Sequence, residues 1–359
     1  MNNTTKTLLI LSPGFPKDEF DTTCVPAQQI FVKNLKQNFP ELNIIVLAFE
    51  YPFFSAEYDW HNVKVIAFGG RNRSKLFRAQ NWLRIWVSLQ KLKKQYNVIG
   101  LLSFWMGECA LIGNAFAKRN NLTFYCWILG QDAKLWNKYF RWIKPQAGSL
   151  IALSDFIAKE FNRNYAITPA NVIPIGIDPG LFKPATGERD IDILGAGSLI
   201  PLKQYFLLVN IINVLRDSFP DIKAVICGNG PEMESLRIMV RTLKLENNVR
   251  LVGELPHTSV LALMQRTKIF VHTSAYEGFG VVCLEALHAG AHVVSFVRPM
   301  DANIPNWHFA YLQDDMLKII TRLLKESTQN YKPVSPYLVN DSNKSVMNLF
   351  NYQEEAVSA

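Results

Sequence analysis

The sequence predicts an α/β protein made of two doubly wound domains that face each other across a cleft. Short apolar runs alternate with amphipathic stretches along the chain, and the same alternation starts again after residue 190. Strands that are apolar throughout and separated by helices are typical of parallel sheets covered on both faces. The 359 residues also suffice for two domains of about 150 residues or more each.

The first half of the chain predicts one such sheet. Its strands are expected at residues 8–11, 44–49, 63–68, 98–103, 124–128, 150–153 and 172–173. The stretches 27–38 and 109–119 have the periodicity of helices that cover a sheet on one side. These elements together predict an N-terminal doubly wound domain.

The second half predicts another sheet of the same kind. Its strands are expected at residues 191–194, 224–227, 250–252, 269–272 and 293–297. Its helices are expected at residues 204–218, 232–244, 259–265 and 281–289. A linker between the two domains is expected at 176–189, because Pro179, Gly180, Pro184 and Gly187 fall close together there.

Positive charge is concentrated in the first half of the chain. The net charge of +8 divides into +10 over residues 1–185 and −2 over residues 186–359. Residues 60–107 contain nine lysines and arginines and no acidic residue. Such a one-sided distribution attracts an anionic surface or substrate.

The basic stretch from Lys75 to Lys94 has an apolar face at helical spacing. This face consists of Trp82, Ile85, Trp86, Leu89 and Leu92. One interpretation is a helix that lies on an anionic membrane with its tryptophans at the interface. The alternative is an ordinary helix that packs these side chains onto the sheet and exposes its basic face.

Several classes of protein are excluded by the sequence. No apolar run approaches the ~20 residues of a membrane-spanning helix. The five scattered cysteines contain no CxxC pair, which argues against a disulfide framework or a zinc site. The apolar run at 8–11 is too short for a signal peptide. We therefore expect a cytoplasmic protein, peripheral on the inner face of the membrane.

Metal and nucleic-acid sites are not expected either. The six histidines lack the spacing of a metal site, and the DxD sequence at 190–192 opens a buried strand. We therefore interpret this DxD as structural and expect no metal. No nucleic-acid recognition motif occurs, so a nucleic-acid-binding protein is supported by charge alone.

Residues 273–286 form the most specific motif of the chain. They follow the predicted strand 269–272, turn through Gly278 and Gly280, and open a helix. Glu277 lies in the turn at the carboxyl end of the strand, where open α/β sheets bind ligands. Glu285 lies in the second turn of the helix, and its carboxylate suits a ribose diol. The alternative is a plain glycine turn and a helix with two surface glutamates.

This motif resembles the E-x-F-G-x(4)-E signature of the retaining glycosyltransferases of family four, the group 1 glycosyltransferases with the GT-B fold. Phe279 completes the match. Further stretches are similar to family motifs in the family's order, namely residues 171–184, 197–203, 226–231 and 248–253. The N-terminal half is similar only at residues 130–132 and 151–154.

The resemblance implies a role for each candidate residue. Three residues would be catalytic. Glu277 would orient the donor sugar and Lys203 would pair with the donor diphosphate. Asp132 would contact the acceptor or the sugar. The donor-binding residues would be Gly14, Ser198, Lys203, Gly228, Gly230, Glu277, Gly278, Phe279, Gly280 and Glu285.

Simpler alternatives remain open for several of these residues. Lys203 could be an exposed lysine at a helix start, where the helix dipole would disfavour it. Asp132 could be the N-cap of the following helix. Gly228 and Gly230 would leave room for the nucleotide base, or could only form a turn. Gly14 could equally be a turn glycine.

Three positions depart from the family pattern. The family usually has arginine at the position of Ser198, asparagine at that of Ile175 and histidine at that of Leu129. The loss of one cation and one imidazole puts the rate and the identity of the donor in doubt more than the class of enzyme.

The sequence and the resemblance together predict a retaining, metal-independent glycosyltransferase with no cofactor besides its nucleotide-diphosphate sugar donor. Residues 1–180 would bind a glycan or lipid-linked acceptor, and residues 181–340 would bind the donor. Residues 341–359 would return as a helix to the N-terminal Rossmann-like domain. The pathway expected is envelope polysaccharide or glycolipid synthesis. The alternatives are a GT-B nucleotide-sugar epimerase and a degenerate sugar-binding scaffold.

Overall fold

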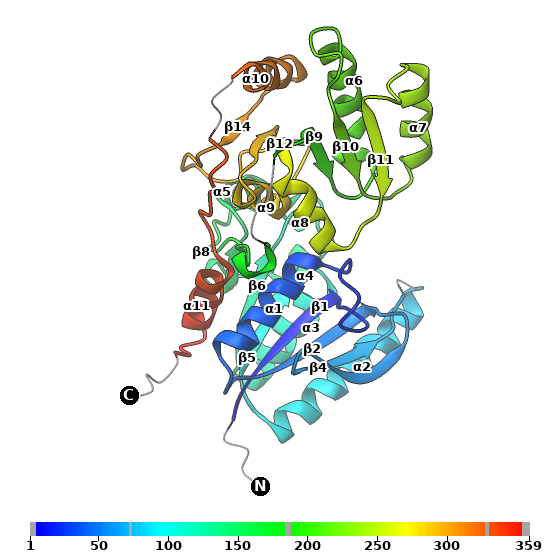
Figure 1. Cartoon of the computed structure of the whole chain (residues 1–359). Helices are drawn as coiled ribbons and strands as arrows, with labels where there is room; N and C mark the ends of the chain where they lie inside the picture. The colour runs from blue at the N-terminus through cyan, green and yellow to red at the C-terminus, as the bar shows by residue number, and fades with distance from the viewer. Residues whose placement is uncertain (1–4, 72–73, 184–187, 327–329, 354–359) are drawn as a thin grey trace. The chain divides into compact units, whose positions relative to one another are not determined.

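The computed structural model describes residues 5–71, 74–183, 188–326 and 330–353. The chain divides into two compact units. Unit 1 consists of residues 1–176 and 339–359, and unit 2 of residues 177–338. Both contain a largely parallel sheet (Figure 1). Pro184 and Gly187 of the expected linker lie outside the described residues.

Unit 1 contains an eight-stranded sheet in the order β3-β4-β2-β1-β5-β6-β7-β8. The strands are β1 (Lys6–Gly14), β2 (Asn43–Tyr51), β3 (Ser55–Trp60), β4 (Val63–Phe68), β5 (Asn97–Phe104), β6 (Thr123–Ile128), β7 (Leu150–Ala152) and β8 (Asn171–Val172). Its helices are α1 (Pro26–Asn38), α2 (Lys75–Gln95), α3 (Glu108–Asn120), α4 (Lys138–Ile143), α5 (Asp155–Tyr165) and α11 (Val339–Leu349). The central strand β1 is fully buried from Leu8 to Leu11, which requires cover on both faces.

One strand of unit 1 corrects the expectation of an all-parallel sheet. β3 pairs antiparallel with β4 through a tight connection, at the edge of the sheet. Its residues alternate between exposed and less exposed positions, as an edge strand requires. The search for continuous apolar runs therefore missed it.

Unit 2 contains a six-stranded, wholly parallel sheet in the order β11-β10-β9-β12-β13-β14. The strands are β9 (Ile191–Ala196), β10 (Ala224–Cys227), β11 (Val249–Gly253), β12 (Thr267–His272), β13 (His292–Ser295) and β14 (Trp307–Phe309). Its helices are α6 (Tyr205–Leu215), α7 (Met233–Thr242), α8 (His257–Gln265), α9 (Val281–His288) and α10 (Gln313–Lys325). In chain order this arrangement is 3-2-1-4-5-6, the doubly wound order, so the predicted fold class is confirmed.

The apolar face of α2 packs inside unit 1. Ile85 and Leu89 are fully buried. Trp82 Nε1 donates a hydrogen bond to Glu108 Oε2 at 2.8 Å, and the ring of Trp86 packs edge-on against Phe116 at 5.3 Å. These contacts show that this face packs within unit 1, as the packing alternative states. Contact between the exposed basic residues of α2 and a membrane stays a prediction.

The helix α11 belongs to unit 1, although it follows unit 2 in the sequence. Ser342 Oγ donates to the carbonyl of Pro174 at 2.6 Å and accepts from the amide of Gly176 at 3.1 Å. Phe350 packs edge-on against Tyr125 at 5.1 Å. The polypeptide therefore crosses between the units twice, once near Gly176 and once near Val339.

Candidate functional site

The candidate site of unit 2 lies where its strand order reverses. β9 and β12 are neighbours in the sheet, and their chain connections leave in opposite directions. Loops at such a point leave a crevice at the carboxyl ends of the strands, which is the usual ligand site of doubly wound sheets. Lys203 follows β9 and Glu277 follows β12, so the fold brings these two candidates to the same edge.

Backbone and side-chain bonds join the two loops that carry these residues. The amide of Ala275 donates to the carbonyl of Leu202 at 2.9 Å, and Thr273 Oγ1 donates to the carbonyl of Lys203 at 2.7 Å. The Lys203 side chain is 19% exposed, so the alternative of an exposed lysine is wrong. The loops hold it against the strand ends instead.

The carboxylate of Glu277 is bound through one oxygen only. Oε2 receives the Lys203 ammonium and a hydrogen bond from His272 Nε2 at 3.3 Å, and Ser274 Oγ lies 3.4 Å from it. In the described part of the chain, no residue donates a hydrogen bond to Oε1. Burial alone would raise the pKa of Glu277, but His272 and Lys203 outweigh it and lower the pKa to about 2. Glu277 is therefore a fixed anion with one oxygen available for a ligand hydroxyl.

His272 is a site residue that the sequence analysis missed. It is the last residue of β12, and its side chain is 4% exposed. Burial lowers its pKa, although the bond to Glu277 opposes this, and the charge of Lys203 lowers it further. A neutral imidazole that faces a carboxylate must carry its proton on Nε2. A signal was present in the sequence, since a histidine ends an apolar strand five residues before Glu277.

Glu285 has a histidine partner as well. His257 Nε2 lies 2.7 Å from Glu285 Oε1, and the two side chains are 17% and 10% exposed. Burial disfavours the protonated imidazole, but the hydrogen bond and charge of Glu285 prevail and raise the pKa of His257. The pair joins the first turn of α8 to the second turn of α9 and fixes the orientation of the carboxylate. Binding of a ribose by Glu285 stays a prediction.

The glycines and the phenylalanine of the motif shape the loops around these carboxylates. Gly280 adopts φ +82° immediately before α9, and its carbonyl accepts from the amide of Cys283 at 2.8 Å. The amides of Val281 and Val282 come before the first intrahelical bond, as at any helix start, and have no acceptor within α9. Such amides suit a phosphate or a sugar oxygen. Gly278 is buried in the turn. Phe279 is 1% exposed and packs near Trp307 and Tyr337, so it anchors the loop in the core.

Gly228 and Gly230 are explained by close packing of two loops. A Cβ at Gly228 would lie 1.9 Å from the carbonyl oxygen of Gly197, and one at Gly230 would lie 2.4 Å from that of Leu199. Both glycines also have strongly positive φ angles. The space beside these Cα atoms is thus filled by backbone, which explains both glycines by loop packing. Contact between these loops and a nucleotide base stays a prediction. Ser198 lies exposed in the adjoining loop.

The two remaining candidates belong to unit 1. Gly14 ends β1, beside the side chains of Tyr51 and Cys24. The Asp132 carboxylate accepts hydrogen bonds from the amides of Met106 and Gly130, each at 2.8 Å. It ties together the loops after β5 and β6, and its burial raises its pKa despite these bonds.

The N-cap of α4 is a different residue from the one considered. The side chain of Asn137 accepts from the amide of Tyr139 and caps this helix. The alternative in which Asp132 is that cap is therefore wrong. Contact between Asp132 and a substrate stays a prediction.

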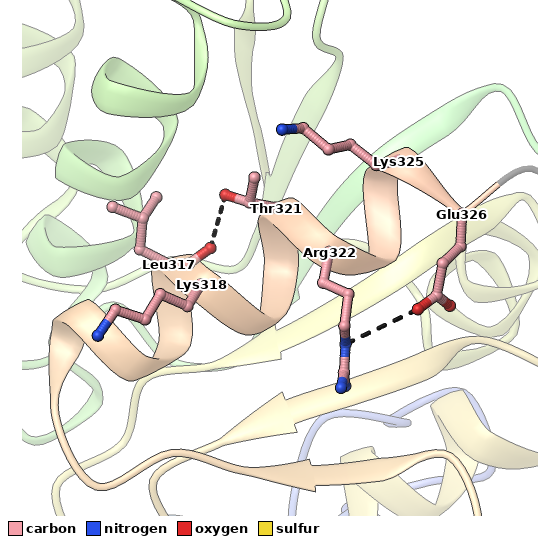
Figure 2. Close-up of a pocket in the computed structure, with 6 residues that line it drawn as sticks. All are labelled: Leu317, Lys318, Thr321, Arg322, Lys325 and Glu326. Atoms are coloured by element: carbon pink, nitrogen blue, oxygen red, sulfur yellow. Dashed lines mark hydrogen bonds and ion pairs between the residues drawn. The ribbon is translucent and has the colours of Figure 1, made fainter.

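A surface depression elsewhere on unit 2 is unconnected with these residues. Figure 2 shows its lining, which comes from α10 alone. It consists of Leu317, Lys318, Thr321, Arg322, Lys325 and Glu326. The dashed contacts join Thr321 Oγ1 to the Leu317 carbonyl at 2.8 Å and Arg322 to Glu326 at 3.8 Å. A depression on the outside of one helix lacks the converging groups of a catalytic site.

The described residues contain neither a cluster suited to a metal ion nor a helix suited to cross a membrane. Among them, no group of three or more histidines, cysteines or acidic residues is placed to hold a metal ion. None of the helices in that part of the chain combines the length and the apolarity needed to cross a membrane. Whether the reaction needs a metal stays a prediction.

The fold and the site define a class: a two-unit α/β protein whose second unit places a lysine and two carboxylates in and beside the loops at the carboxyl ends of its parallel strands. Residues 181–304 match the family "Glycosyl transferases group 1". The resemblance seen in the sequence is therefore confirmed for this segment of the chain.

Curated relatives match part of the chain. A phosphatidylinositol N-acetylglucosaminyltransferase subunit from Homo sapiens is 35% identical over 127 residues, covering 35% of this chain and 26% of the relative. Glycogen synthase from Mycobacterium tuberculosis is 29% identical over 176 residues, covering 47% of this chain and 42% of the relative. The aligned part of the chain thus spans less than half of these relatives' lengths.

Solved structures match over almost the whole chain. Anabaena Alr3699/HepE in complex with UDP and glucose superimposes with a TM-score of 0.69 at 15% identity, covering 96% of this chain and 99% of that one. TarM superimposes with a TM-score of 0.68 at 13% identity, covering 98% and 99%. At this identity the likeness establishes the fold, which is the GT-B fold.

Proposed function

We propose that this protein is a retaining glycosyltransferase that moves a sugar from a nucleotide-diphosphate donor to an acceptor hydroxyl. Unit 2 binds the donor at the carboxyl ends of β9 and β12, and unit 1 binds the acceptor. The observation that carries the proposal is the pairing of Lys203 with Glu277 at this switch point, with Glu277 Oε1 open and Glu285 eight residues further on.

Each polar group of unit 2 has a task in this proposal. Lys203 and the first amides of α9 bind the diphosphate and stabilise the charge that develops on it as the sugar leaves. Glu277 Oε1 accepts a hydrogen bond from a hydroxyl of the donor sugar. Glu285, oriented by His257, accepts from the ribose.

Donor binding changes the partner of Lys203. The ammonium turns from Glu277 to the diphosphate, and His272 keeps the carboxylate in place during this exchange. The bond between the anomeric carbon and the phosphate oxygen breaks, the acceptor oxygen bonds to the same face of the sugar, and the departing phosphate takes the acceptor's proton. No protein nucleophile is assigned.

The relatives support a particular class of donor and acceptor. The names of several contain N-acetylglucosaminyltransferase, and solved neighbours hold UDP with glucose or GlcNAc. We infer a UDP-sugar donor and a glycolipid or glycan acceptor, in envelope polysaccharide or glycolipid synthesis. We propose that the protein works in the cytoplasm, on the inner face of the membrane.

Thermal unfolding with UDP-, GDP- and ADP-sugars tests donor binding. The wild type should be stabilised by one nucleotide class, by about 2.7 kcal/mol at a concentration of 100 Kd. The stabilisation should be lost in Glu285→Ala and kept in Glu246→Ala, a matched change at an exposed glutamate. If no nucleotide sugar stabilises the wild type at millimolar concentration, the degenerate scaffold replaces this proposal.

Product analysis separates the transferase from the epimerase. A retaining transferase gives a glycoside with the anomeric configuration of the donor sugar. The coupling constant of the anomeric proton in the NMR spectrum of the product measures this configuration. An epimerase changes the sugar nucleotide without any acceptor. An acceptor-free reaction that inverts a stereocentre of the sugar, and does not merely hydrolyse the donor, would therefore reject the transferase.

A further inference from the structure

A group of large side chains lies exposed on unit 1 between β6 and β7. Trp136 is 82% exposed, Trp142 58% and Leu135 50%. Lys138, Arg141 and Lys144 are exposed beside them. We call these six residues the Trp136–Trp142 surface. No acidic residue occurs in the sequence between Asp132 and Asp155.

This surface is held firmly from behind. The Asn137 side chain donates to the carbonyls of Met106 at 2.9 Å and Asp132 at 3.0 Å while it caps α4. Ile143 is 2% exposed, and its carbonyl accepts from Asn114 at 3.2 Å. The exposed tryptophans therefore project from a segment that is fixed to α3 and to the loops after β5 and β6.

Exposure of these tryptophans gives no packing benefit to unit 1. Trp136 also adopts φ +76°, a conformation that is unfavourable for a bulky side chain. Clustered large apolar side chains on a surface mark a contact with a partner. A strained residue held by its surroundings points in the same direction.

We propose that the Trp136–Trp142 surface rests on an anionic lipid bilayer. Tryptophan side chains favour the boundary between lipid headgroups and acyl chains, and neighbouring lysines and arginines are attracted to anionic headgroups. Glu108 contacts α4 through Tyr139 but is paired with Arg78 at 2.9 Å, so it does little to oppose this attraction. The helix α2 offers a contrast, since its tryptophans face inward.

The place of this surface fits a lipid-linked acceptor. Asn137 joins it to the loops after β5 and β6, at the carboxyl edge of the unit 1 sheet. Parallel sheets bind ligands at this edge. An acceptor headgroup can therefore reach the edge while its lipid stays in the bilayer. This last step rests on the proposed function; the bilayer contact does not.

Sedimentation with vesicles tests the proposal on the full chain. At low salt the protein should bind vesicles of phosphatidylcholine mixed with phosphatidylglycerol and should bind pure phosphatidylcholine weakly. The triple variant Lys138→Gln, Arg141→Gln, Lys144→Gln should lose affinity on the order of a hundredfold. The double variant Trp136→Ser, Trp142→Ser should also lose binding, and with it any quenching by brominated lipids.

A second triple variant provides the matched control. Lys91→Gln, Lys93→Gln, Lys94→Gln removes the same charge from α2 and should bind as the wild type does. Loss of binding in this control, or unchanged binding in the two Trp136–Trp142 variants, would overturn the proposal. Equal binding to a soluble polyanion such as heparin would identify an anionic glycan as the partner instead. Loss of a dimer in the tryptophan variant would identify a second copy.

Donor stabilisation in the same variants separates the two proposals. All variants should keep the wild-type melting temperature, because the changed side chains are exposed. They should also keep the wild-type shift with nucleotide sugar, because the changes lie in unit 1. Vesicle binding without any donor shift would reject the proposed function alone. A donor shift without vesicle binding by the wild type would reject the bilayer contact alone.

Discussion

In unit 2 the loops at the switch point carry paired side chains, whereas in unit 1 the loops after β5 and β6 are tied by backbone amides to one carboxylate. Glu277 and Glu285 each meet a histidine, and Glu277 also meets Lys203. Asp132 instead accepts from the amides of Met106, Leu129 and Gly130. The same doubly wound plan thus holds paired titratable side chains at the loops of one unit and a carboxylate bound by backbone amides at the loops of the other.

This difference explains why one unit was easier to interpret from the sequence. The groups of unit 2 sit in a short motif with fixed spacing, and the family match covers residues 181–304. In unit 1 the frame around Asp132 joins backbone groups, which leave little trace in residue identity. If the two units divide the tasks in this way, changes in unit 2 should alter donor binding and transfer. Changes in unit 1 should alter stability or the use of the acceptor.

The largest effect is expected for Lys203→Ala. Removal of the ammonium leaves the leaving diphosphate without its side-chain cation, and loss of one such group costs roughly 10²–10³ in kcat. Donor hydrolysis or transfer under single-turnover conditions measures it. Lys223→Ala, at an exposed lysine of the same unit, should be neutral. Equal activity of Lys203→Ala and wild type would show that this lysine does not bind the donor.

Glu277 should make the stability of unit 2 depend on pH in the acid range. Its pKa of about 2 lies below the ordinary value of 4.5, so its contribution is complete above about pH 4.5 and is lost as the pH falls towards 2. The shift corresponds to at most about 3 kcal/mol. Urea unfolding between pH 2 and 7 should show this slope in the wild type and a flatter one in Glu277→Gln.

The His272→Leu variant sharpens that test. Loss of the imidazole donor should raise the pKa of Glu277. The fall in unfolding free energy on acidification should then begin at a higher pH. His272→Gln, which keeps an N–H donor, should restore much of the wild-type profile. The kcat should fall more than the KM rises, because the carboxylate is held less firmly once Lys203 has turned to the diphosphate. An unchanged pH profile in His272→Leu would argue against its positioning role.

A smaller effect, confined to unit 1, is expected for Asp132→Asn. The neutral amide can no longer accept from all the backbone amides that the carboxylate binds, which costs about 1–3 kcal/mol of unfolding free energy. Denaturant unfolding measures it. The donor-induced shift of unit 2 should stay as in the wild type. A lost donor shift would mean that Asp132 acts on donor binding, against the division of tasks inferred here.

The smallest effect is expected for His257→Ala. Loss of one hydrogen bond to Glu285 should weaken nucleotide binding by about 1 kcal/mol, or several-fold. The pKa of His257 is raised, so its contribution to stability is complete below the ordinary pKa of 6.5 and is lost as the pH rises through the raised value. Calorimetric titration with nucleotide at pH 6 and 8 should show a larger difference between wild type and variant at pH 6.

The sequence was enough to predict both sheets and most of the candidate site, for reasons that particular residues make clear. Continuous apolar runs such as 8–11 and 269–272 identify buried parallel strands, because both of their faces are covered. The edge strand β3 alternates in exposure and escaped that search. His272 escaped because only the folded strand end brings its ring to Glu277. Gly228 and Gly230 were expected to leave room for a base, and the contact between loops that explains them is a tertiary feature.

The contact between Lys203 and Glu277 also means that the anion site carries its own counter-ion. An anion that arrives at Lys203 replaces a carboxylate already held in place, instead of displacing ions from solution. Binding by such an exchange changes little with salt concentration, in contrast to attraction by an open cluster of cations. Small anions should bind weakly at Lys203, since they must compete with the Glu277 carboxylate that His272 keeps in position. A ligand that also donates a hydrogen bond to the freed carboxylate, as the proposed sugar-diphosphate donor would, gains from both halves of the exchange.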